Sequence, residues 1–208
     1  MAVAQQAPIN FAVMYATHDA FRRDLERFAA AVAAGRAGSP RVRAGWENFK
    51  RQLHVHHTVE DAVLWPRVAA QVTDRPEDQK LLAEMESEHA GLDAVLAAVD
   101  AGMSQGAADL GERVDRLAQA LGSHMRHEED AALPLIQDVL TNKDWDAFRG
   151  AMAKKQGPKG AAVYIPWVMD GRDVAERKRF LDCMPAPVKV LNKLFWESSY
   201  QKRGLFSA

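Results

Sequence analysis

The feature that most constrains this chain is a His-x3-Glu-x5-Pro pattern that occurs twice with identical spacing, at residues 56–66 and 124–134. Residues four apart lie one above the other on the same face of an α-helix. Each histidine can therefore reach the same point in space as its glutamate. The repeat predicts two equivalent helices that contribute matching halves of one polar centre.

Apolar residues spaced three and four apart predict four amphipathic helices, at residues 11–32, 46–64, 81–99 and 110–132. Turn-forming residues separate them at 35–40, 73–76 and 102–106. No segment alternates apolar and polar residues over the length of a strand, so no β-sheet is expected. Short connections favour antiparallel neighbours, and we therefore predict an all-α fold, an antiparallel four-helix bundle.

Ionisable residues interrupt these apolar stripes on the sides that are predicted to face inward. Each would cost several kcal/mol to bury unless it were paired or bound to an ion. Two carboxylates can bridge two ions while four imidazoles fill the remaining positions, and such mixed ligation suits iron, with manganese and zinc next. The predicted metal ligands are His18, His56, Glu60, His89, His124 and Glu128.

Three further histidines, His54, His57 and His127, lie beside these stripes. They are expected to be solvated or to support the centre from outside the ligand set. A different register, which pairs His57 with Asp61, keeps the four-residue spacing but loses the match to the fourth helix. Glu86 and Glu88 are candidate partners for the ring of His89.

These motifs resemble those of the hemerythrin-like, or HHE cation-binding, family. The resemblance lies in Thr-His-Asp at 17–19, the two repeats with their Pro66 and Pro134, and Glu-His at 88–89, and it spans about residues 10–140. It implies two non-haem iron ions with an oxo or hydroxo bridge. The family pattern makes Glu60 and Glu128 bridging ligands and makes the four predicted histidines terminal ligands.

One position departs from the oxygen carriers of that family, which have a further histidine where this chain has Met85. A thioether is a poor iron(III) ligand, so one ion is expected to have fewer protein ligands and an open position. Tyr15, three residues before His18, is the candidate catalytic residue and oxygen donor at that position.

The chain is expected to divide into the metal-holding bundle, residues 1–140, and a C-terminal helical extension, residues 141–208, that packs on it. Short helices are predicted at 144–155, 173–183 and 188–197. Residues 1–140 carry a net charge of −7 and residues 141–208 one of +6, so the two parts can attract each other. The aromatic segment 164–167 is a candidate lid over an end of the bundle.

The formal net charge of −1 gives no reason to expect nucleic acid or an acidic membrane as a partner. The N-terminus lacks the basic and apolar regions of a signal peptide, and the single Cys183 cannot form an internal disulfide. A cytoplasmic protein, monomeric or weakly dimeric, is the expectation.

Three functions fit a di-iron bundle of this kind. The first is an enzyme that converts hydrogen peroxide into oxygen and water, which an open metal position favours. The second is a protein that binds or senses oxygen or nitric oxide. The third is iron handling without turnover, which exchangeable metal would favour.

Overall fold

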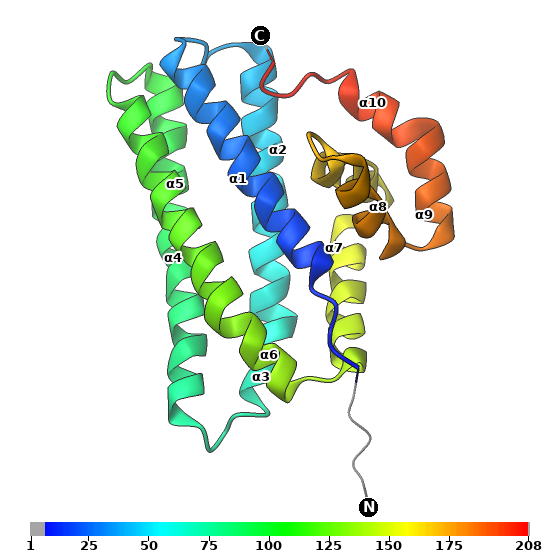
Figure 1. The fold of residues 1–208 in the computed structure, drawn as a ribbon. Helices are drawn as coiled ribbons and strands as arrows, with labels where there is room; N and C mark the ends of the chain where they lie inside the picture. The colour runs from blue at the N-terminus through cyan, green and yellow to red at the C-terminus, as the bar shows by residue number, and fades with distance from the viewer. Residues whose placement is uncertain (1–6, 208) are drawn as a thin grey trace, which may run out of the picture.

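The computed structural model describes residues 7–207, and within that range the chain is helical and has no strand. The bundle consists of α1 (Ala12–Ala33), α2 (Pro40–Val59), α4 (Pro76–Gln105) and α5 (Leu110–His127). Figure 1 shows these helices side by side, with α1 beside both α2 and α5 and with α4 beside α5. The predicted all-α bundle is confirmed.

Local sequence explains where these helices begin and end. The hydroxyl of Ser39 accepts a hydrogen bond from the backbone N–H of Val42 and caps α2, whose first residue is Pro40. Helix α4 ends at Gly106, which has a φ of 62°, a conformation that glycine adopts without steric cost. The bundle helices therefore turn back at positions that the sequence marks clearly.

Helices α2 and α5 each pass into a wider π-helical turn at the glutamate of the repeat. The turns are η1 (Glu60–Leu64) and η2 (Glu128–Ala132), and they lead into α3 (Trp65–Ala69) and α6 (Leu133–Val139). Pro66 and Pro134, the second residues of α3 and α6, have no N–H to continue an α-helical ladder. Such π turns occur often at functional sites, and these two were not predicted.

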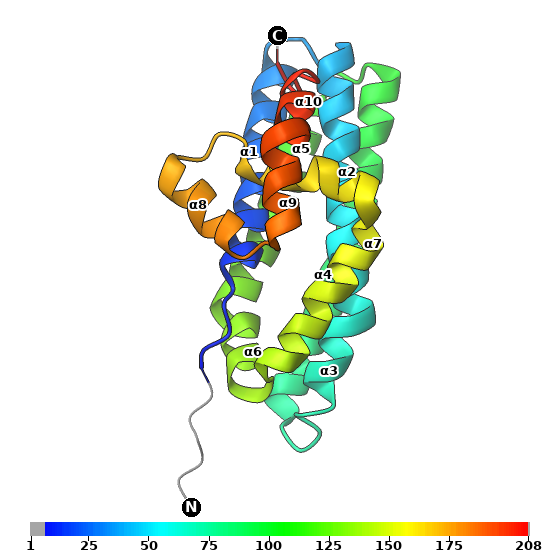
Figure 2. The same ribbon diagram turned by 90° about the vertical axis from the view of Figure 1, so that its right-hand side faces the viewer.

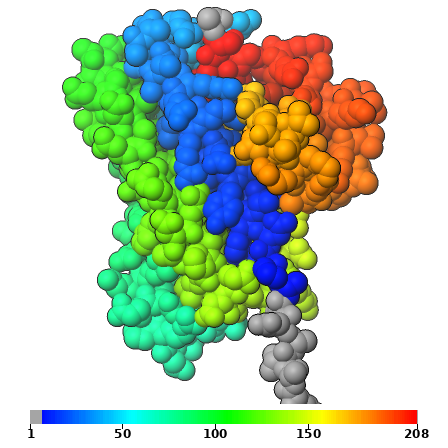
Figure 3. Space-filling model, viewed as in Figure 1, coloured from blue at the N-terminus to red at the C-terminus, as the bar shows by residue number. Residues whose placement is uncertain are grey.

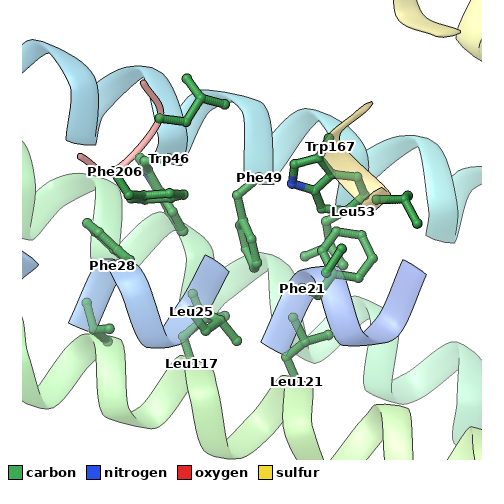
Figure 4. Packing of buried hydrophobic residues seen from close by; sticks show 14 of the residues in the cluster. Phe21, Leu25, Phe28, Trp46, Phe49, Leu53, Leu117, Leu121, Trp167 and Phe206 are labelled. Atoms are coloured by element: carbon green, nitrogen blue, oxygen red, sulfur yellow. The ribbon is translucent and has the colours of Figure 1, made fainter. Parts of the chain in front are cut away.

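The bundle core is divided along its length into two apolar clusters. One is rich in aromatic residues, among them Phe21, Trp46 and Phe49, and fills the half of the bundle drawn in Figure 4. The other contains Trp65 and Met85 and fills the opposite half. His56 of α2 and His89 of α4 lie in sequence between residues of the two clusters, so both clusters shield the polar layer from water.

The extension contains α7 (Asn142–Met169), α8 (Val174–Asp182), α9 (Ala186–Leu191), η3 (Asn192–Trp196) and α10 (Glu197–Gln201). Helix α7 begins behind a capping box of Thr141 and Asp144. Gly157, at φ 62° and ψ 174°, breaks α7 into two halves. The half after Gly157 includes segment 164–167, which the sequence analysis had not assigned to a helix.

Helix α7 lies along the side of the bundle against α1 and α2 (Figure 2). The Trp167 indole donates to the buried Asp24 of α1 at 2.7 Å, and the Tyr164 hydroxyl lies 2.7 Å from that of Thr17. Segment 164–167 therefore covers the side of α1 next to His18 instead of an end of the bundle. The rest of the extension packs on the same side, as Figure 3 shows.

None of the helices within residues 7–207 combines the length and the apolar composition needed to cross a bilayer.

Candidate metal centre

All six residues predicted as metal ligands are buried in the layer between the two apolar clusters; none is more than 6% exposed. His18 from α1 and His56 from α2 point their Nε2 atoms at each other across 3.2 Å. Glu128 completes this group, with an Oε2 atom 3.1 Å from His18 Nε2. We call His18, His56 and Glu128 the first group.

A second group lies between α2, α4 and α5. The Nε2 atoms of His89 and His124 are 3.1 Å apart. His57, from α2, stacks on the His89 ring with the ring centroids 3.9 Å apart and the planes 13° from parallel. One ligand atom from each of these three histidines lies within 4.8 Å of the others. We call His57, His89 and His124 the second group.

Glu60 joins the two groups. Its Oε1 atom lies 3.2 Å from His56 Nε2, and its Oε2 atom lies 3.8 Å from His89 Nε2. A carboxylate placed in this way can share its two oxygens between two ions. Spacing in the sequence predicted that Glu60 lies beside His56, and the family resemblance implied the bridging position; a π turn begins at this residue.

Carboxylates hold three of the imidazoles from outside. His18 Nδ1 donates a hydrogen bond to Glu129 at 2.7 Å and His89 Nδ1 donates one to Asp61 at 2.7 Å. His124 Nδ1 donates one to Glu88 at 2.8 Å. Such bonds fix each ring with Nε2 directed inward and make that nitrogen a better metal ligand. Glu88, one of the two candidates named for His89, instead binds His124.

His57 was predicted to lie outside the ligand set, but the fold places it beside His89 and His124. Its Nε2 atom is buried and has no hydrogen-bond partner in the described part of the chain. The alternative pairing with Asp61 does not arise, because Asp61 binds His89. The only available sign was the second histidine of the His56-His57 pair, which the helical periodicity placed beside the inward face.

In the absence of metal, the predicted ligands have pKa values that are shifted in different directions. Burial lowers the pKa of His18, but Glu128 and Glu129 outweigh that effect and raise it to about 9. The pKa of Glu128 falls to about 2 because His18 outweighs the effect of burial. Burial and the neighbouring carboxylates raise the pKa of Glu60 well above its ordinary range. Metal binding at neutral pH must therefore displace a proton from His18.

The buried carboxylates fit a cation better than they fit an empty core. Both oxygens of Glu60 and Oε1 of Glu128 are buried without a hydrogen-bond partner within residues 7–207, whereas Oε2 of Glu128 faces the His18 ring at 3.1 Å. Leaving such groups unpaired costs several kcal/mol, whereas a metal ion would satisfy the oxygens and the converging imidazole nitrogens together. The donor set of nitrogen and oxygen atoms, with no thiolate, suits iron.

Tyr15 is not brought to this centre. Its side chain is 43% exposed, and it makes no hydrogen bond or ring contact with either group in the range that the structure describes. Met85, by contrast, is fully buried in the apolar cluster beside the centre. The expected oxygen donor therefore has no support from the geometry.

Comparison with known proteins gives an independent result. The sequence profile of the hemerythrin HHE cation-binding domain matches residues 9–136, which is more than half of the chain. The search found no match among curated proteins or solved structures. The matched region ends within α6 and includes both histidine groups and both glutamates. The chain belongs to the hemerythrin HHE cation-binding family.

Proposed function

We propose that the centre holds two iron ions, one at each histidine group, and that the protein turns over hydrogen peroxide. The observation that carries the two-ion proposal is the position of Glu60, with one oxygen facing each group. Bound iron would supply Lewis-acid and redox chemistry, through which two molecules of peroxide give one of oxygen and two of water. This chain's residues would hold the ions, orient their imidazole ligands and exclude bulk water.

His57 would be the fifth imidazole of the centre. The first group would then contribute two imidazoles and the second group three. A histidine from α2 would thus replace the nitrogen ligand that Met85 removes from α4. The open position would lie at the ion held by His18 and His56, the group with fewer nitrogen ligands.

A carboxylate at the edge of the centre connects the proposed ligand His124 to a histidine nearer the surface. Glu88 accepts a hydrogen bond from His124 Nδ1 through one oxygen and from His127 Nδ1 through the other, each at 2.8 Å. The His127 side chain is 33% exposed, whereas that of His124 is 1% exposed. Glu88 would thus orient the His124 ring and increase the electron donation of its Nε2 atom to the bound ion, which would support the redox chemistry of turnover.

Peroxide turnover is tested by measuring oxygen after peroxide is added to iron-loaded protein. We expect oxygen release well above that from an equal concentration of free iron, in a ratio of one oxygen to two peroxides. Glu88→Gln keeps the shape of the residue but removes its charge, and we expect it to slow turnover by about tenfold or more while iron is retained. Oxygen release no faster than that from free iron would refute the peroxide proposal.

Reversible oxygen binding is the second candidate, and one observation favours it. With His57, the centre would have five imidazoles, in groups of two and three. This is the number of histidine ligands that the oxygen carriers of the family have. Such a protein would change its visible spectrum when oxygen is admitted, and would reverse that change under vacuum. Oxygen evolution from peroxide without this reversal would favour the enzyme.

A further inference from the structure

A pocket of about 360 Å³ opens beside the metal centre. It lies between α1, α2 and the two halves of α7, and one side is closed by Met184 from the link between α8 and α9 and by Val188 from α9. Its volume falls in the range of small-molecule sites. The metal ligand His56 is part of its wall, so a molecule in this pocket would contact the centre.

The pocket has exposed charged side chains at its mouth and buried uncharged polar side chains at its inner end. Asp146 and Arg149 line it, and their side chains are 71% and 37% exposed, which places them toward solvent. His56 and Gln156 also line it but are only 3% and 8% exposed. The remaining wall is largely apolar and includes the aromatic residue Phe148. A ligand would therefore bury an apolar body and present a polar group to His56 and Gln156.

His56 and Gln156 are both placed next to Gln52 and line the same pocket. The Gln156 amide donates to the Gln52 side chain at 2.6 Å, and Gln52 is one helical turn before His56 on α2. Both side chains have an unmet hydrogen-bonding atom, because His56 Nδ1 and Gln156 Oε1 are buried without a partner across residues 7–207. The Nδ1 atoms of His18, His89 and His124 all have carboxylate partners.

The two atoms without hydrogen-bond partners have opposite roles, because one accepts a hydrogen bond and the other donates one. Gln156 Oε1 can only accept a hydrogen bond. A histidine that binds metal through Nε2 carries its proton on Nδ1, so His56 would donate one. A single hydroxyl group can donate to the first atom and accept from the second. Neither atom offers a full charge for an ion, which favours an uncharged ligand.

We propose that this pocket binds an uncharged aromatic alcohol of the phenol class, with its hydroxyl between His56 and Gln156 and its ring among the apolar side chains. The aromatic residues Trp145, Phe148 and Tyr164 of the wall suit a ring. The donor role of His56 rests on the proposed metal centre, whereas the pocket and Gln156 do not. Binding would alter the environment of His56 and thereby the iron spectrum.

The test uses three probes of similar shape, 4-ethylphenol, ethylbenzene and 4-ethylbenzoate, titrated into the full chain by calorimetry, both metal-free and iron-loaded. We expect 4-ethylphenol to bind at least about tenfold more tightly than either of the others, because only it satisfies both polar atoms without a buried charge. In iron-loaded protein it should also shift the existing visible band.

A pair of neighbouring variants locates the site. Ala161 lines the pocket and Ala162 does not, although both are partly buried on α7. Ala161→Phe should weaken 4-ethylphenol binding by about tenfold or more, whereas Ala162→Phe should leave it unchanged. Circular dichroism checks that both variants fold. Gln156→Met, which removes the acceptor, should reduce the preference for 4-ethylphenol over ethylbenzene.

Several results would overturn the proposal. These are equal binding of ethylbenzene, equal loss in the two phenylalanine variants, or no 4-ethylphenol binding to either form. A new phenolate-to-iron absorption band would place the hydroxyl on the metal and would also contradict it. If the protein fails to hold iron but metal-free protein still selects 4-ethylphenol, then the metal proposal fails while the pocket stands.

Discussion

Replacement of Glu60 by alanine is expected to lower the metal content from about two ions per chain to one or fewer. The reason is that Glu60 is the carboxylate whose oxygens face both histidine groups. Its loss would remove a ligand from each ion at once and leave the imidazoles and Glu128 to hold them. Elemental analysis of protein purified under identical conditions measures the effect, and retention of two ions would remove Glu60 from the set of ligands.

The same assay separates the two histidines that flank His56. His57 belongs to the second group, whereas His54 is exposed on the outer face of α2. His57→Phe should reduce occupancy or affinity at one ion, and His54→Phe is the matched control that should change neither. Equal metal contents in the two variants would return His57 to a supporting position outside the ligand set.

Removal of metal by a chelator is expected to lower the unfolding temperature by roughly 10 °C. Both oxygens of Glu60 and one oxygen of Glu128 would then be left buried without a hydrogen-bond partner. Metal at about 1,000 times its dissociation constant adds about 4 kcal/mol to the free energy of unfolding. For a chain of this size each kcal/mol corresponds to about 2–4 °C. Calorimetry before and after chelation measures the shift.

The control for that experiment is the double variant Glu60→Ala, Glu128→Ala. Without the two buried carboxylates, added iron should no longer raise its unfolding temperature. A chelated wild-type protein that melts within about 2 °C of the iron-loaded protein would mean that the metal contributes little to stability. The unpaired carboxylates would then need another explanation.

Much of the bundle and its polar layer follows from spacing in the sequence. The apolar repeats predicted the four bundle helices, and Gly35 and Gly106 marked two of the turns. The matched repeats predicted that His56 and His124 would come together with their glutamates, and the fold brings all of them into one layer. Periodicity is informative here because it depends only on helix geometry.

Other features depend on tertiary packing and were not predictable in this way. His57 joins His89 and His124 only because α2 and α4 pack with a particular rotation about their axes. Glu88 was predicted as a candidate partner of His89 and Asp61 only as an alternative partner of His57, whereas in the fold Asp61 binds His89 and Glu88 binds His124. The second half of α7 was missed because Gly157 and Pro158 indicated a break, whereas the chain kinks at Gly157 and resumes a helix.

The most direct measurement is the metal content of protein purified without added metal, together with its ultraviolet and visible spectrum. The proposed centre predicts about two irons per chain and the absorption of an oxo-bridged iron(III) pair, which should change when hydrogen peroxide is added. Iron well below one per chain, or zinc alone, would contradict the di-iron centre and point to a protein that handles metal without turnover.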